Sequence, residues 1–298
     1  MDTLVEIRAL DENTARAKEA VRAAYEEIRG VEDLMSAEKE GTEIYLLNHG
    51  GTGWVELSEE TLSVLRSSLE YSRLSGGAFD ITVKPLVDLW MREVKRTGRL
   101  PSPERLWVVW GWGGGEKLEV ENGRARFLQE GMEVTLGAIA KGYAVDRACR
   151  ALQERGVEAG LVNVGGEIRG FGKVWRIGVQ HPRKEEVMLE LELENFSIAT
   201  SGDYRRFFLL GSTRIHHILD PRTGEPAGEC MSVTVIAENC LDADALATAL
   251  FVLGPERGKE LADNLCSSGR EVKAMLVGSD GRILYSDSWD LPKIEELP

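Results

Sequence analysis

The sequence predicts a single α+β domain built from mixed, mainly antiparallel sheets with packed helices. Segments with helical and strand-like periodicity are mixed along the 298 residues without regular βαβ alternation. Several strand-like runs are joined by tight turns that contain glycine, which is typical of antiparallel hairpins. No linker, low-complexity tract or internal repeat divides the chain. We therefore treat residues 1–298 as one domain.

The first part of the chain predicts a strand, two helices and an outlying segment. Residues 3–10 alternate like a strand, and residues 12–36 have Ala and Val at helical spacing, with Gly30 near a plausible stop. A second helix begins at Ser58, where a capping signature precedes apolar residues at helical spacing. Residues 91–130 form a peripheral excursion that includes a hairpin with Glu-Asn-Gly as its turn.

The second part predicts two further helices among strands. A helix over 140–155 is followed by Gly156 as its C′ residue, and a helix over 240–253 is closed by Gly254. A hairpin over 204–220 turns at Gly211-Ser212. Further strands and a last hairpin are expected at 159–172, 174–181, 187–200, 232–239 and 273–286.

Charge and cysteine content exclude some classes of function. The 36 Lys and Arg against 50 Asp and Glu give a net charge of −14, which argues against nucleic acid or an anionic membrane as the main partner. One phosphorylated ligand in a locally positive cleft remains compatible with this charge. The four cysteines form no C-x-x-C motif and are not spaced for a zinc site, so we expect them to be small buried residues. No membrane span or signal peptide is predicted, and the localisation stays open.

Asp244 and Thr248 are the first candidate site residues. They lie four apart on the predicted helix over 240–253 and therefore share a face. A carboxylate one turn before a hydroxyl offers two hard oxygens, which suit Mg²⁺ better than Zn²⁺. The plain alternative is an acidic residue in the first helical turn and a tolerated threonine. Spacing alone favours this alternative.

Glycine-containing loops supply weaker candidates. Gly137 and Gly142 flank the start of a helix whose N–H groups, together with Lys141, would suit a phosphate, although no P-loop is present. Gly76-Gly77 would let a ligand approach Asp80, and Phe79 would cover an aromatic ring. A tight strand-to-helix turn and a helix C-cap are the respective alternatives.

His216 and His217 are adjacent in the predicted hairpin. Because successive side chains of a strand point to opposite faces, only one of them would face a given pocket. Strand alternation cannot choose between them. After them, Arg222 would clamp either Asp220 or a phosphate.

Taken together, these segments resemble the ApbE family. The resemblance rests on five blocks in the family's order, "GGAFDITVKPLVDLW", "LGAIAKGYAVDRACRALQERGVEAGLVNVGGEIRGFG", "IATSGDYRRFF", "HHILDPRTGEP" and "SVTVIAENCLDADALATALFVLG". It runs from Met1 to about the final hairpin. Joint chance occurrence of five such blocks is not credible.

The resemblance implies an ApbE-like fold with a ligand cleft between its sub-domains. It implies a Mg²⁺-dependent FAD:protein FMN transferase that splits FAD, attaches FMN to a threonine of a target protein and releases AMP. The target would be a redox-complex subunit. By position, the catalytic residues are His217, Asp244 and Thr248, and His217, not His216, would activate the acceptor hydroxyl. The metal would be held by Asp244, Thr248 and the carbonyl of Ala138. Flavin contacts would come from Met1, Ala78, Phe79, Asp80, Lys141, His217 and Ile218.

Two departures from the family pattern matter. The family tyrosine falls at Glu38 and the family arginine at Leu46, while Asn48 is kept. The tyrosine position is associated with the balance between transfer and hydrolysis, so Glu38 keeps an FAD pyrophosphatase as the alternative. A flavin-binding protein without turnover is a third possibility. Thr135 stands where an aspartate is often found, which removes one expected contact to the nucleotide.

Overall fold

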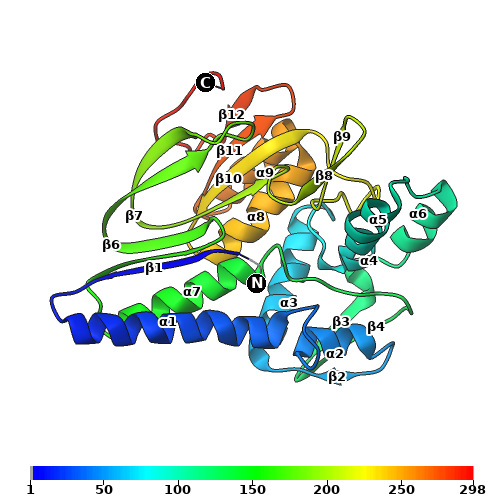
Figure 1. The fold of residues 1–298 in the computed structure, drawn as a ribbon, viewed down its shortest axis with the longest axis horizontal. Helices are drawn as coiled ribbons and strands as arrows, with labels where there is room; N and C mark the ends of the chain where they lie inside the picture. The colour runs from blue at the N-terminus through cyan, green and yellow to red at the C-terminus, as the bar shows by residue number, and fades with distance from the viewer. Residues whose placement is uncertain (1–2, 298) are drawn as a thin grey trace.

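A seven-stranded antiparallel sheet forms the centre of the molecule. The computed structural model describes residues 3–297, and Figure 1 shows the sheet above two long helices. The strand order is β1-β5-β6-β7-β10-β11-β12, and every neighbouring pair is antiparallel. The strands are β1 (Val5–Leu10), β5 (Ala159–Val164), β6 (Glu167–Gln180), β7 (Val187–Gly202), β10 (Cys230–Ala237), β11 (Val272–Gly278) and β12 (Ile283–Tyr285).

Helices cover one face of this sheet. α8 (Cys240–Leu253) packs on β7 and β10, α7 (Ala140–Glu154) packs on β5 and β6, and α1 (Thr14–Met35) packs on α7. α9 (Pro255–Ser267) lies beside α8 and contacts β11. The other face packs against the C-terminal segment through a second apolar cluster around Trp175 and Trp289. The predicted mixture of helices and antiparallel strands is therefore confirmed.

The junction of α7 and α8 is the most closely packed point near the predicted site. A Cβ added to Gly142 would lie 2.1 Å from the carbonyl oxygen of Cys240, so only glycine lets the two helices approach this closely. The Asp146 carboxylate accepts from the N–H groups of Cys240 and Leu241 at 3.0 and 2.9 Å. α7 thus supplies acceptors for the first turn of α8, whose N–H groups have no partner within the helix.

A smaller lobe lies beside the main sheet. It contains α2 (Glu43–His49), α3 (Glu59–Leu74) and a three-stranded sheet in the order β2-β4-β3. Ser58 caps α3 by accepting from the N–H of Thr61, as the sequence predicts. The strands are β2 (Val55–Glu56), β3 (Leu118–Glu121) and β4 (Arg124–Phe127).

The excursion is shorter than the predicted 91–130. Leu118, Ala125 and Phe127 of the β3–β4 hairpin are buried in the main core, so this hairpin is not peripheral. The projecting part consists of short helical segments around a separate apolar cluster that includes Trp90 and Val109. These segments are α4 (Lys84–Asp88), η2 (Leu89–Val94, a π-helix), α5 (Lys95–Thr97) and α6 (Pro103–Trp110). They are preceded by η1 (Ile81–Val83), whose Ile81 belongs to the main core, and followed by η3 (Gly115–Lys117).

Two other expectations differ from the structure. α1 continues through Gly30 to Met35, because Val31 and Met35 are buried against the core and outweigh the low helix propensity of glycine. α9 was not expected, although Pro255 at its first position is a helix-start signal.

Three of the four cysteines are buried and all four are free. Within residues 3–297, no helix combines the length and apolar character that crossing a membrane requires. That residues 1–298 form one domain stays a prediction.

Candidate active site

Lys141, Asp244 and Glu167 meet where α7, α8 and β6 begin. The N–H of Gly142 donates to Oδ2 of Asp244 at 3.0 Å, and Nζ of Lys141 lies 3.4 Å from its Oδ1. The same ammonium forms an ion pair with Glu167. Two of the residues predicted to bind the ligand and metal, Lys141 and Asp244, are therefore in direct contact.

Thr248 and Ala138, the other two predicted metal ligands, lie on or just before the two helices that carry Asp244 and Lys141. Thr248 lies one turn after Asp244 on α8, and its hydroxyl is 3.1 Å from the hydroxyl of Ser201 at the end of β7. Ala138 precedes α7 by two residues. Among the described residues no hydrogen bond to its carbonyl is found, because the N–H of Gly142, its helical partner by spacing, donates to Asp244 instead. This carbonyl thus retains an unused acceptor within the described part of the chain.

Burial and charge set the electrostatics of the group. Burial raises the pKa of the Asp244 carboxyl to about 7; the Lys141 ammonium opposes this rise and Glu167 adds to it. Burial alone would lower the pKa of Lys141, but the carboxylates of Asp244 and Glu167 outweigh it and raise that pKa. Lys141 therefore stays a cation and is a suitable partner for a phosphate.

Glu167 was not among the predicted site residues. Glu167 is only 4% exposed, and its second carboxylate oxygen, Oε2, has no hydrogen-bond partner in residues 3–297. A buried unpaired carboxylate oxygen is costly, and such oxygens commonly face a missing ion or ligand group. The sequence signal was the Gly165-Gly166 turn, in which both glycines have positive φ and set Glu167 at the start of β6.

The residues predicted to contact the flavin from the smaller lobe are held tightly. Ala78 and Phe79 are buried, and the Phe79 ring packs edge-on against Tyr71 at 6.2 Å between centroids. Phe79 therefore does not present its ring to a ligand, contrary to our expectation, and a flavin contact would use its backbone. Asp80 caps η1 by accepting from the N–H and hydroxyl of Thr82 at 2.8 and 2.7 Å, and burial raises its pKa.

The two adjacent histidines have different environments. β9 (Thr213–His216) ends before His217. The alternation of side chains along a strand therefore does not relate His216 to His217. Nε2 of His216 donates to the Ala227 carbonyl at 2.8 Å, and its Nδ1 accepts from the N–H of Ile218. His216 is 5% exposed and packs edge-on against Phe251, so of the two roles expected for it, a surface residue or a neighbour of the site residues, the first is wrong.

His217 is half-buried and keeps one ring nitrogen free. Its Nδ1 donates to the carbonyl of Arg206 at 3.3 Å, which leaves Nε2 as an acceptor for a proton. Burial lowers the pKa of His217 to about 4, and the positive charges of Arg206 and Lys141 contribute to this shift. The imidazole is therefore neutral at pH 7. Ile218, the next residue, is buried and its carbonyl accepts from the N–H of Ala227.

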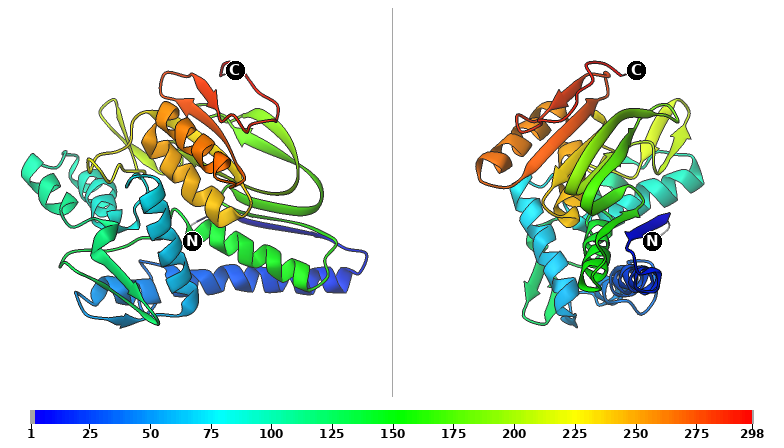
Figure 2. Two further views of the ribbon diagram at one scale, coloured as in Figure 1. Left: turned by 180° about the vertical axis from the view of Figure 1, so that it is seen from behind. Right: turned by 90° about the vertical axis from the view of Figure 1, so that its left-hand side faces the viewer.

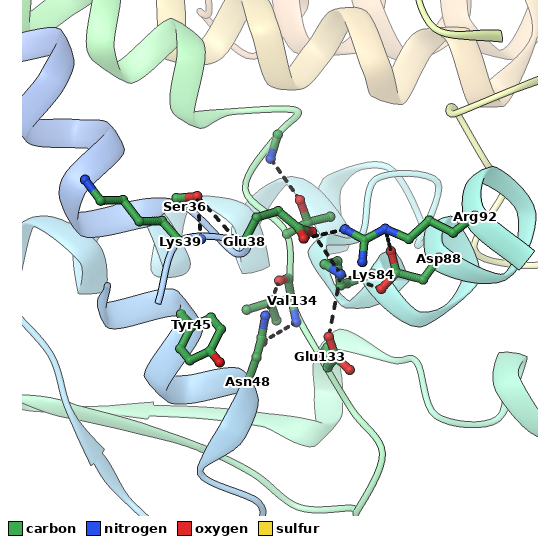
Figure 3. Close-up of polar contacts among 12 residues, drawn as sticks. Ser36, Glu38, Lys39, Tyr45, Asn48, Lys84, Asp88, Arg92, Glu133 and Val134 are labelled. Carbon is green, nitrogen blue, oxygen red and sulfur yellow. Dashed lines mark hydrogen bonds and ion pairs between the residues drawn. The ribbon is translucent and has the colours of Figure 1, made fainter. Parts of the chain in front are cut away.

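Glu38 lies in a network of ion pairs between α1 and the projecting helices. Figure 3 shows its carboxylate directed toward Arg92 and Lys84, both of which donate to it, the latter at 3.1 Å. Lys84 also contacts Asp88 at 2.5 Å and Glu133 at 3.7 Å. Although partial burial would raise the pKa of Glu38, these two cations outweigh it and lower that pKa. Glu38 is therefore an anion fixed by two cations, at the position where the resemblance predicts the family tyrosine.

The other predicted positions lie around this network. Asn48 forms two hydrogen bonds with the backbone of Val134, at 2.9 and 2.8 Å, and Figure 3 shows it below Glu38. The N–H of Thr135 donates to the carbonyl of Ile81, which ties the segment before Ala138 to the one after Asp80. Met1 lies outside the described residues.

Two surface hollows do not coincide with this group. One, of about 520 Å³, is lined by Glu56, Glu121, Asn122 and Arg124. The other, of about 510 Å³, lies between β1 and α1. A ligand cleft between the sub-domains therefore stays a prediction.

Comparisons with known proteins identify the family and the fold of this chain. A family model described as "ApbE family" matches residues 1–275. An FAD:protein FMN transferase of Vibrio cholerae serotype O1 is 37% identical over 244 residues, which cover 78% of this chain and 73% of the relative. A transferase of the same name from Treponema pallidum is 30% identical over 315 residues, which cover 95% of this chain and 84% of the relative.

Solved structures show the same fold. An ApbE protein of Thermotoga maritima superposes with a TM-score of 0.87 at 31% identity, covering 96% of this chain and 97% of the other. The flavin transferase ApbE of Vibrio cholerae superposes with a TM-score of 0.85 at 31% identity, covering 97% and 95%. The chain belongs to the ApbE family.

Proposed function

We propose that this chain is a Mg²⁺-dependent FAD:protein FMN transferase whose reaction takes place at Lys141, Asp244, Thr248 and His217. The relatives of the same name support the activity. The observation that carries the location is the convergence of Lys141 and Asp244 at the N-terminus of α7, where helix N–H groups and an ammonium meet.

The reaction requires one bond to form and one to break. The hydroxyl oxygen of an acceptor threonine bonds to the phosphorus of the FMN half of FAD. The bond from this phosphorus to the bridging oxygen breaks, and AMP leaves with the electron pair. The hydroxyl proton passes to Nε2 of His217, whose Nδ1 is held by the Arg206 carbonyl. Because His217 is neutral at pH 7, it is ready to accept this proton.

Asp244, Thr248 and the Ala138 carbonyl fit a hard divalent cation. They offer one carboxylate, one hydroxyl and one carbonyl. The carbonyl, that of Ala138, accepts no hydrogen bond from the described residues. These are the oxygen types that Mg²⁺ prefers, and its other positions are usually filled by water and substrate phosphates. Residues 3–297 contain no cluster of three or more His, Cys, Asp or Glu that would make a cage of its own. When bound, Mg²⁺ neutralises charge on the diphosphate.

Lys141 would bind the diphosphate beside this site. Its ammonium is shared by two carboxylates, so a phosphate oxygen can replace one of them while the other holds the side chain in place. The buried backbone of Ala78 and Ile218 would then line the flavin end of the ligand. Asp80 would contribute through the loop that it caps.

Hydrolysis of FAD to FMN and AMP is the second candidate. The observation that favours it is Glu38, a carboxylate held by Arg92 and Lys84 where the family tyrosine is expected. A held anion cannot stack on a flavin ring, and water would then compete with the acceptor hydroxyl at the same site.

One assay separates the candidate functions. The protein is incubated with FAD, Mg²⁺ and a threonine-bearing acceptor protein, and the products are analysed by mass spectrometry. An acceptor that gains FMN supports transfer, free FMN with AMP supports hydrolysis, and intact FAD leaves only binding. The variant Asp244→Ala is expected to lose either reaction, and full activity in that variant would contradict the metal assignment.

A further inference from the structure

The β8–β9 hairpin projects from the body of the molecule beside the proposed site. β8 (Phe207–Leu210) pairs only with β9 (Thr213–His216), and no other strand in residues 3–297 joins this sheet. Figures 1 and 2 show the hairpin extending away from the main sheet, near the projecting helices. Its two edges are therefore not covered by the central sheet.

The backbone of β8 presents unused hydrogen-bonding groups along its outer edge. The N–H of His217 donates to the carbonyl of Arg206, which identifies residues 206 and 217 as a hydrogen-bonded pair. Such pairs alternate along an antiparallel ladder, so Phe207 and Leu209 are at non-bonded positions in the register. Their N–H and C=O groups point away from β9, and no hydrogen bond to them is found among the described residues.

The side chains of this edge are apolar and basic. Phe207 is 40% exposed and Leu209 63%, while their neighbours Phe208 and Leu210 face the apolar cluster of the projecting helices. The guanidinium of Arg214 lies 4.1 Å from the centroid of the Phe207 ring. Arg214 also lies 3.9 Å from the carboxylate of Asp203, but Asp203 is shared with Arg183, so the three groups together keep a positive charge beside this edge.

Two further arginines extend this surface toward the proposed site. Arg205 and Arg206 are exposed, and Arg206 has no ion pair within residues 3–297. The Arg206 carbonyl holds both the N–H and the Nδ1 of His217, at 3.2 and 3.3 Å. The hairpin thus ends at the imidazole that would accept the proton.

We propose that the outer edge of β8 is the docking site for the acceptor protein. An extended acceptor segment adds as a third strand beside Phe207–Leu210, and its acidic side chains meet Arg205, Arg206 and Arg214. This recognition mode uses backbone hydrogen bonds for affinity and side-chain pockets for specificity. We choose the edge of β8 because this strand carries the exposed apolar side chains Phe207 and Leu209, and because the residue before it, Arg206, binds His217 through its carbonyl. The inference rests on the proposed transferase function.

The direct test measures binding without catalysis. The probe is a short fluorescein-labelled peptide in which one threonine is flanked by alternating valines and aspartates, and fluorescence polarisation gives its Kd. The wild-type protein is expected to bind it about tenfold more tightly than the same peptide with lysines in place of aspartates. Equal affinity for the two peptides, or no binding of either, would overturn the proposal.

Leu209→Pro tests the backbone edge. Proline removes the outward N–H and leaves the bonds to β9 intact, as is tolerated on an edge strand. It is expected to weaken peptide binding about tenfold, whereas Leu209→Ala, which keeps the N–H, changes binding by less than about threefold. Unchanged FAD affinity and an unchanged melting curve show that the variant is folded. Equal losses in the two variants would mean that only the side chain matters and would overturn strand addition.

Arg206→Glu tests the charge, with Arg96→Glu on the projecting helices as its control. Both arginines are exposed and neither has an ion pair in the described part of the chain. Only Arg206→Glu is expected to weaken binding of the acidic peptide, by about tenfold. If both variants weaken binding equally, the peptide responds to positive charge anywhere on this side of the molecule, and the docking site at the hairpin is contradicted.

Two last measurements distinguish acceptor docking from self-association and from a failure of the transferase function. If the edge instead pairs with a second copy of this chain, light scattering detects a dimer that Leu209→Pro disrupts, and the proposal fails. If wild-type protein binds the peptide but transfers no FMN to any acceptor, the docking site stands and the transferase function fails. If transfer to an acceptor occurs at equal rates in wild type and Leu209→Pro, the transferase function stands and the docking site fails.

Discussion

The N–H of Gly142 donates to the carboxylate of Asp244, and this hydrogen bond joins the first turn of α7 to α8 at 3.0 Å. Because that N–H is used by Asp244, the Ala138 carbonyl retains its acceptor capacity. One contact between helices therefore both orients the carboxylate and prepares a second oxygen for a cation. The glycine is essential to this arrangement, since a side chain there would meet the backbone of Cys240.

Gly142→Ala is expected to destabilise the protein and to impair its activity. Its Cβ would lie 2.1 Å from the Cys240 carbonyl oxygen, so α7 and α8 must move apart. Overpacking of this kind typically costs about 1–3 kcal/mol. The control is Gly30→Ala in α1, where an added Cβ meets nothing within 4 Å. That variant should gain about 0.5–1 kcal/mol in the free energy of unfolding. Urea denaturation compares both, and equal stability of the two variants would contradict the packing argument.

Asp244→Asn is expected to abolish turnover while the protein stays folded. The amide keeps an acceptor for the N–H of Gly142 but loses the charge that a cation needs. Lys141 remains paired with Glu167, so no isolated buried cation is created. Calorimetry should find no Mg²⁺ binding in this variant. Asp242→Asn, two residues earlier on α8, should retain both binding and turnover, and its failure would point to a general effect of charge.

Glu167→Gln is expected to loosen Lys141 without removing it. The substitution keeps the shape of the side chain but breaks the ion pair, so the ammonium is left with Asp244 alone. An ammonium bound to Asp244 competes with a cation there, and Mg²⁺ affinity should fall about tenfold. Titration of the FAD-free protein measures this directly. An unchanged affinity would show that the ion pair between Lys141 and Glu167 does not control the binding of a cation at Asp244.

His217→Ala and His216→Ala are expected to impair different properties, the first turnover and the second stability. His217 is the proposed proton acceptor, and its loss should lower turnover about 10²–10⁴-fold with little change in stability. His216 donates to Ala227 and packs on Phe251, so its loss should cost about 1–3 kcal/mol of folding free energy and affect turnover only through stability. Melting curves and turnover numbers for both variants separate the two roles. Equal losses of turnover at temperatures where both are folded would contradict them.

Local sequence patterns predicted most elements because their causes are local. The capping of α3 by Ser58 and the turn at Gly211-Ser212 depend on residues close in the chain. Non-local contacts account for the main errors. The burial of His216 depends on Ala227 and Phe251, and the burial of Phe79 depends on Tyr71. No periodicity in residues 214–219 or 76–80 carries that information.

The same distinction between local patterns and non-local contacts applies to the candidate site. Asp244 and Thr248 share a helix face, which spacing alone establishes, but the contact of Asp244 with Lys141 joins segments about a hundred residues apart in sequence. The resemblance to the family supplied that link. Glu167 was missed because its significance lies in an unpaired buried oxygen, which only the folded arrangement reveals.

The pH dependence of transfer should reflect a histidine that is hard to protonate. Burial lowers the pKa of His217 to about 4, so its neutral form predominates above that pH. The acid limb of kcat/KM is expected near pH 4 rather than near the ordinary value for histidine. The unfolded chain binds this proton below about pH 6.5, so stability should fall as pH drops from about 6.5 to 4. An acid limb near pH 6.5 that His217→Ala leaves unchanged would exclude His217 as its source.

Glu38→Tyr is expected to shift the balance from hydrolysis toward transfer. The substitution removes the carboxylate that Arg92 and Lys84 hold, and it places an aromatic ring where the family has one. Lys84 keeps Asp88 at 2.5 Å, so the buried ammonium is not left unpaired. Mass spectrometry of the acceptor and of free FMN gives the ratio of the two products.

Two controls decide what a change in this ratio means. Glu38→Gln breaks the ion pairs without adding a ring, and Glu40→Tyr adds a ring two residues away at an exposed position. If only Glu38→Tyr raises the ratio of transfer to hydrolysis, the ring is responsible. If Glu38→Gln raises it equally, the negative charge of Glu38 itself opposes transfer, and the ring is not required. No change in any variant would remove Glu38 from the choice between the two reactions.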